Sequence, residues 1–282
     1  MTKLLLAILF VAPALRAQVV VISNDVPPLP VNTRITNLAI NGAIGSVTGL
    51  VWASIRHSSK WKGLTQGAAG GLLMSAGRQI AATPFNGSGF LGREVSAVGV
   101  SLTASSGEEH TLFVFPIGPM SLEYGERSWD WRLDVADFGA LVGLAIASNT
   151  SLDLHRTLSS GVPVFRDRRA SFGQVEDYTL TAITELGTIR LSQDAFTVLP
   201  GTANVIYHEN VHILQDDFFE DAIGLPPERQ AIEHLPFGRR FLRHLDLGLL
   251  GPCLVSGMSG LIPYKPRPWE REAYALTANL YY

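Results

Sequence analysis

The sequence predicts an α+β protein with an N-terminal Gly-rich helical hairpin, a central antiparallel β-sheet and C-terminal helices that carry a metal site. Three observations support this prediction. Uncharged segments with glycines at helical spacing come first, short β-prone runs separated by turn residues follow, and helical patterns with a His-Glu-x-x-His motif come last. The corresponding regions are residues 18–107, 108–200 and 201–282, which together could form one domain.

Residues 1–17 have the form of a secretory signal peptide. Lys3 precedes an apolar run that ends at Ala14, and Ala17 is a small residue at the expected cleavage point. This run is short for a membrane span, and no cysteine follows it to carry a lipid anchor. We therefore expect a secreted or periplasmic protein whose fold begins after residue 17.

Two Gly-rich segments predict the helical hairpin. Residues 35–55 contain no charged side chain, and residues 63–83 contain only Arg78. Small residues at three- and four-residue spacing let two helices approach closely. A basic turn, residues 56–62, joins the two segments. We expect the hairpin, residues 35–83, to pack against the rest of the protein, while membrane association, a spanning pair and oligomerisation are alternatives for the same residues.

The middle of the chain predicts short strands. Residues 128–136 alternate strictly between apolar and charged side chains, as a half-buried strand does. Other strand candidates are residues 111–115, 151–154, 162–165, 178–183 and 188–192. Residues 91–104 and 138–147 fit either a helix or a strand. We expect the aromatic residues of this region to belong to the core.

Composition limits the function classes. The net charge of −3 gives no electrostatic reason to expect nucleic-acid binding. Cys253 is the only cysteine, so the chain cannot form an intrachain disulfide, and we expect a small buried apolar residue there.

The strongest chemical signal is His-Glu-x-x-His at residues 208–212. Residues four apart on a helix share a face, so His208 and His212 can bind one metal ion. Glu209 follows the first histidine, near enough to act as general base on a metal-bound water. The surrounding stretch is apolar, and buried polar groups need partners such as a metal. A structural helix without metal is the alternative.

Two histidines leave a zinc site one protein ligand short. A histidine six residues after the motif would complete a metzincin site, but that position is Phe218. A carboxylate from a downstream helix is the remaining solution. The candidates are Glu270, which we place first, then Glu272 and Glu233, and lastly Glu228.

The motif followed by Glu270-x-x-Ala273 resembles the gluzincin zinc metallopeptidases, in which a second helix supplies the glutamate ligand. The resemblance implies Zn²⁺ held by His208, His212 and Glu270, with Glu209 as general base. The chain departs from the family at Tyr274, where an aspartate often supports a ligand histidine. By residue type alone, the side chains that could stabilise an oxyanion are Tyr264, Tyr274, His234 and His244.

Two functions are compatible with these residues. The first is a secreted or periplasmic zinc-dependent metallopeptidase that hydrolyses peptide bonds in a peptide or protein substrate. The second is a catalytically inactive zincin-like protein of the cell envelope, with a binding or structural role and with or without membrane association.

Overall fold

The computed structural model describes residues 18–21, 32–109, 112–125, 128–175, 178–197, 202–224, 232, 238, 242, 244–246 and 268–277. Within these residues the chain forms eight α-helices, one π-helix and two small mixed sheets, so the predicted α+β class is confirmed. The predicted signal peptide at 1–17 lies outside the described residues. The same is true of Cys253, Glu228, Glu233, His234 and Tyr264.

The elements of the N-terminal half are β1 (Gln18–Val21), α2 (Asn32–Ile55), α3 (Lys60–Ala81), α4 (Ser88–Ala104), β2 (Phe113–Ile117), β3 (Met120–Gly125), β4 (Ser128–Asp134) and α5 (Val135–Ile146). Those of the C-terminal half are β5 (Thr150–Leu152), α6 (Leu154–Ser160), β6 (Val164–Asp167), β7 (Gln174–Val175), β8 (Tyr178–Glu185), β9 (Thr188–Leu191), α7 (Asp194–Thr197), α8 (Thr202–Asp217), η2 (Phe218–Gly224), β10 (Leu245–Asp246) and α12 (Pro268–Thr277).

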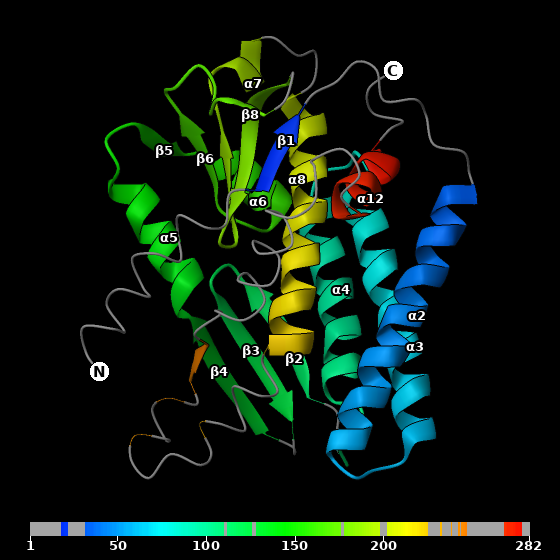
Figure 1. The fold of residues 1–282 in the computed structure, drawn as a ribbon. Coiled ribbons are helices and arrows are strands. Elements are labelled where there is room, and N and C mark those ends of the chain that lie inside the picture. Colours follow the sequence, from blue (N-terminus) through cyan, green and yellow to red (C-terminus); the bar gives the residue numbers. More distant parts are fainter. Residues whose placement is uncertain are drawn as a thin grey trace.

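The predicted hairpin is present as α2 and α3, and α4 extends it into a layer of three helices (Figure 1). Glycines allow this close packing. A Cβ on Gly45 would lie 2.2 Å from the Gly67 carbonyl oxygen, and a Cβ on Gly77 would lie 2.5 Å from that of Gly92. The run at 91–104, for which the pattern left helix and strand open, is therefore a helix held against α3 by small residues.

The strands form two sheets, one ordered β1-β8-β9-β6-β5 with β7 beside β8, and the other ordered β10-β4-β3-β2. The expectation of purely antiparallel pairing is wrong for two pairs, since β6 runs parallel to β9 and β10 runs parallel to β4. Between β6 and β9 the chain forms β7 and β8, and β8 runs antiparallel to both β7 and β9. Strand β9 therefore runs in the same direction as β6. Strand β1 joins this sheet beside β8.

The alternation in β4 is present, but its charged face is the one that is buried. Arg132 is only 3% exposed, whereas Trp129 and Trp131 are 63% and 44% exposed. Ion pairs from Arg132 to Glu123 (2.8 Å) and Asp246 (3.4 Å) compensate its burial. The expectation that the aromatic residues of this region are core residues is therefore wrong for these two tryptophans.

Two further segments in the predicted β region are helical. The apolar run at 138–147 is part of helix α5, which begins where the Asp134 carboxylate accepts the Asp137 backbone N–H at 2.7 Å. Residue 154 begins helix α6 and does not end a strand, because Asp153 caps that helix by accepting the Arg156 backbone N–H.

Helix α8 lies between the three-helix layer and the first sheet (Figure 1). One side of it packs through Val205, Ile206 and Ile213 into the core beneath β6, β8 and β9. The π-helix η2 continues α8 directly, and Phe218 packs there with Met74 of α3 and Val100 of α4. The predicted helix at 269–276 is α12, which lies against α8.

Among the described residues, one helix is long and apolar enough to cross a membrane by length and composition. It is α2, over Ile35–Ile55.

Candidate metal centre

Helix α8 brings the two motif histidines together, because they are one turn apart on the same face. Their Nε2 atoms are 3.1 Å apart, and the rings stand edge to face with centroids 4.8 Å apart. Both side chains are fully buried.

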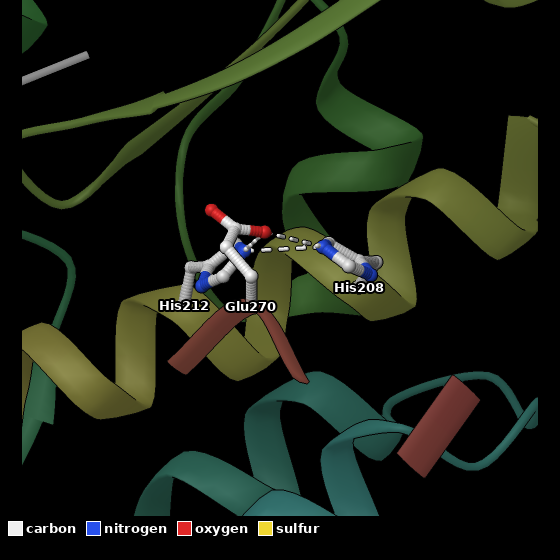
Figure 2. A group of neighbouring side chains, drawn as sticks. All are labelled: His208, His212 and Glu270. Carbon is white, nitrogen blue, oxygen red and sulfur yellow. Dashed lines mark hydrogen bonds and ion pairs between the residues drawn. The ribbon is translucent and has the colours of Figure 1, made fainter. Parts of the chain in front are cut away.

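Glu270, from the first turn of α12, completes the group (Figure 2). Its Oε2 lies 3.3 Å from His212 Nε2 and 3.6 Å from His208 Nε2. Figure 2 shows the carboxylate facing both rings from the second helix. The structure thus brings Glu270 to the histidines, whereas Glu272 binds Arg78 and Gln215 instead.

Gln215 determines the tautomer of His212. The Gln215 Nε2 donates to the Trp269 carbonyl (3.1 Å) and to Glu272 Oε2 (2.9 Å), which fixes the orientation of the amide. Its Oε1 therefore faces His212 Nδ1 at 2.8 Å and accepts a hydrogen bond from the Nδ1–H. In the neutral ring, the lone pair of His212 is then on Nε2, the atom that faces Glu270.

Thr277 acts in the same way on His208. Its hydroxyl donates to the Ala273 carbonyl at 2.8 Å, so the Thr277 Oγ1 can only accept from His208 Nδ1, which lies 3.5 Å away. His208 therefore also presents its Nε2 lone pair to the centre.

When both rings are neutral, three lone-pair atoms converge at this point, and a metal ion or a proton on His212 relieves the repulsion between them. Their separations of 3.1, 3.3 and 3.6 Å can be compared with those around a tetrahedral ion. Metal–ligand bonds of about 2.0–2.1 Å at tetrahedral angles separate the ligand atoms by about 3.3–3.4 Å. The buried cluster His208, His212 and Glu270 could therefore hold a metal ion.

The electrostatics of the cluster also favour one positive charge. Burial opposes charging of His212, but Glu270 and Glu209 outweigh it and raise its pKa to about 9. Burial and the neighbouring charge of His212 lower the pKa of His208 to about 4. Burial opposes ionisation of Glu270 as well, yet the two rings lower its pKa to about 2. The carboxylate thus remains negative beside the rings.

Glu209 is fully buried and close enough to the cluster to interact electrostatically with His212 and Glu270. The Thr184 hydroxyl, from strand β8, donates to Glu209 Oε2, while Glu209 Oε1 has no hydrogen-bond partner. Burial raises the pKa of Glu209 to about 8, against the opposing effects of His212 and Thr184. Glu209 therefore has one oxygen held in place by Thr184, and its raised pKa makes the ionised carboxylate a stronger base than an exposed glutamate.

Behind His212 lies a buried polar network that joins four helices. Glu272 of α12 accepts from Gln215 of α8, from Arg78 of α3 (3.0 Å) and from Asn41 of α2 (3.0 Å). The ion pair with Arg78 lowers the pKa of Glu272 despite its burial. Through Gln215 this network holds the His212 ring in place, and position 274, where the resemblance led us to expect an aspartate, is a tyrosine.

Sequence reasoning did not identify Gln215, Thr184 or Thr277 as parts of the centre. The spacing of Gln215, three residues after His212, was an available signal, because residues three apart on a helix are neighbours. Thr277 similarly follows Glu270 by two helical turns. Thr184 reaches Glu209 from a distant strand, and no local pattern indicates it.

The other residues singled out in the sequence take different places. Tyr274 packs its ring on His208 with centroids 4.5 Å apart. His244 stacks on Trp131 next to β4, outside the cluster around Glu270. Phe218, at the position of the metzincin third histidine, is a buried core residue.

Comparison with known proteins found no matching family model, no matching curated protein and no matching solved structure.

Proposed function

We propose that this protein is a zinc-dependent metallopeptidase that acts outside the cytoplasm on peptides or proteins. The observation that carries the proposal is the convergence of His208 Nε2, His212 Nε2 and Glu270 Oε2, with the buried Glu209 interacting electrostatically with His212 and Glu270. The signal-peptide pattern at residues 1–17 supports the location.

The donor set favours zinc among the common metals. Two imidazole nitrogens and one carboxylate oxygen are a ligand combination of catalytic zinc sites, which keep their fourth position for water or substrate. Magnesium and calcium prefer six or more oxygen ligands. The cluster offers only one carboxylate to two nitrogens.

The proposed chemistry assigns a proton-transfer role to Glu209. Zinc, when bound, supplies Lewis acidity that polarises a peptide carbonyl and lowers the pKa of water. Thr184 holds Glu209 Oε2, so Oε1 is the oxygen that accepts the proton of the attacking water. Glu209 then delivers that proton to the leaving amine as the C–N bond breaks. Gln215 keeps the His212 ring oriented through these steps, and Thr277 does so for His208.

A second candidate function is favoured by one observation. His208, Glu209 and His212 are completely closed to solvent, and Glu270 is 1% exposed. Peptide hydrolysis requires this centre to open to substrate, whereas a structural metal site does not. The alternative is thus an inactive zincin-like protein of the cell envelope in which the ion ties α8 to α12.

Metal content tests the zinc part of the proposal. We expect about one zinc per chain in the purified protein and a large loss of zinc in His208→Ala, measured by elemental analysis. The matched control is His155→Ala, because His155 is exposed on α6 and far from the cluster in sequence. Equal zinc content in all three proteins would exclude His208 as a ligand.

Glu209→Gln tests catalysis separately from metal binding. The amide can still accept from Thr184, so the fold and the zinc content should be retained. Loss of the general base should lower peptidase activity by at least about 100-fold. Activity is measured by mass spectrometry on a mixed peptide library, with Glu109→Gln on the surface as control. A zinc-loaded wild-type protein without activity on any peptide would favour the structural alternative.

A further inference from the structure

The outer face of α2 carries an unbroken aliphatic stripe. Its large side chains are between 44% and 62% exposed. The residues of this stripe are Ile40, Ile44, Val47, Val51 and Ile55. They recur every three or four residues, so they share one side of the helix from residue 40 to its end. Soluble proteins rarely leave an apolar surface of this extent uncovered.

The opposite side of α2 is occupied by the protein itself. Gly45 and Gly49 lie against the backbone of α3, and the Trp52 indole donates to the Ala222 carbonyl of η2 at 2.9 Å. Asn41 binds Glu272. The packed side of α2 is therefore made by its glycines, Asn41 and Trp52, and the aliphatic stripe points away from it. Figure 1 shows α2 as the outermost helix of its layer.

We propose that this stripe is a lipid-binding face that holds the protein on the surface of a bilayer, with α2 lying in the membrane plane. The stripe contains no charged side chain, and the exposed Ser54 hydroxyl is satisfied within the helix by the Leu50 carbonyl at 2.7 Å. At one end, Lys60 and Trp61 are exposed, and Trp61 is 73% exposed. Tryptophan and lysine at the end of an apolar surface suit the headgroup region.

A convex row of β-branched aliphatic residues is a poor protein-binding surface. Specific interfaces are enriched in aromatic residues, methionine and arginine and have a polar rim that fixes the register. The stripe provides none of these along its length. Hydrocarbon chains require only that the surface be apolar, and they adapt to its shape.

Packing within the fold favours α2 lying in the membrane plane over spanning. The π-helix η2 runs alongside the helical layer, from Phe218, which packs with Met74 and Val100, to Ala222, whose carbonyl accepts from the Trp52 indole. If α2 and α3 spanned a bilayer, Glu220 and Asp221 of η2 would lie at the depth of the hydrocarbon, where charged groups are costly. In the planar orientation only the stripe enters the lipid.

Site-specific labelling tests this proposal. In a full-length Cys253→Ser background, a polarity-sensitive fluorophore is attached to Ile40→Cys, Val47→Cys or Ile55→Cys. The matched control is Ile146→Cys, an exposed aliphatic position on α5, on the opposite side of the molecule (Figure 1). Circular dichroism checks that each labelled protein retains its helices. The probe is a phosphatidylcholine vesicle with nitroxide-labelled lipid.

We expect vesicles to shift the emission of all three α2 labels to shorter wavelength, and nitroxide lipids to quench these labels to a similar extent. The label at position 146 should keep its emission. Unchanged emission on α2, or equal quenching at position 146, would overturn the lipid-binding face. If the label at position 47 were quenched only by nitroxides deep in the bilayer, and the labels at 40 and 55 only by nitroxides near its surface, α2 would span the membrane. That result would overturn the planar orientation. A shift that depends on protein concentration and needs no lipid would overturn the proposal in favour of a second copy of the chain.

Discussion

The Gln215 side chain orients one of the two histidines of the metal centre. Its amide is fixed by Trp269 and Glu272, and this orientation gives His212 the tautomer that presents Nε2 to the cluster. Removal of such a supporting hydrogen bond typically costs 10–100-fold in metal affinity. We therefore expect Gln215→Leu to weaken zinc binding by about 10–100-fold, as measured by competition with a chromophoric chelator.

The control for this prediction is Gln79→Leu on α3, since Gln79 is half-buried but lies outside the cluster. It should leave zinc affinity unchanged. If Gln215→Leu bound zinc as tightly as the wild type, Gln215 would have no role in orienting His212.

The sequence was informative about those residues of the centre that share a helix. His208, Glu209 and His212 follow from helical geometry alone. The choice between Glu270 and Glu272 depends on how α12 is rotated against α8, because the two carboxylates are two residues, or about 200°, apart on the helix. The sequence left this rotation open, because both faces of α12 carry a glutamate and packing partners from α2 and α3 determine which one turns inward.

At the level of helices, backbone contact between α2 and α3 makes a specific prediction. A Cβ on Gly67 would lie 2.1 Å from the Gly45 carbonyl oxygen, so Gly67→Ala must push the helices apart. We expect the free energy of unfolding to fall by about 1–3 kcal/mol or more, as measured by chemical denaturation.

Gly143→Ala in α5 is the matched control, since no atom lies within 4 Å of its added Cβ. Alanine is the better helix former, so this variant should be stabilised by up to about 1 kcal/mol. If both variants shifted stability in the same direction and to the same extent, close packing of α2 on α3 would not contribute to stability.

Periodicity located most elements but not the side of each that is buried. Strand β4 alternates as predicted, yet its charged residues face inward because Arg132 finds Glu123 and Asp246 there. Those partners come from β3 and from β10, and a pattern within residues 128–136 contains no information about them. In α2 the aliphatic residues are likewise exposed, whereas the apolar face of a helix is usually buried, because glycines form the face of α2 that packs on α3.

For the molecule as a whole, the distribution of charge between helices and sheet affects stability. Arg93 of α4 and Arg132 of β4 are both buried, and the carboxylates of Asp217, Asp221 and Asp246 gather around them. Burial raises the pKa of Asp221 to about 8, and the charges of Asp246 and Asp217 add to this effect against Arg132. The folded protein therefore binds a proton there that the unfolded chain releases.

This proton makes stability depend on pH in a defined direction. The pKa of the Asp221 carboxyl is near 3.8 in the unfolded chain and about 8 in the folded protein. The stability that Asp221 contributes to the folded protein is therefore fully present below pH 3.8. It is lost as the pH rises towards the folded value. Since 26% of the Asp221 side chain is exposed, we expect solvent to reduce the effect. The loss between pH 5 and 8 should still be at least about 1 kcal/mol.

Asp221→Asn isolates this contribution, because asparagine imitates the protonated carboxyl and does not titrate. Denaturation at pH 5 and pH 8 should show the variant gaining stability relative to the wild type as the pH rises. Other groups titrate alike in both proteins and cancel in the comparison. Glu109→Gln, an exposed control, should follow the wild type at both pH values. A constant difference between Asp221→Asn and the wild type would mean that Asp221 is ionised in the folded protein throughout this range, with Arg132 compensating its burial.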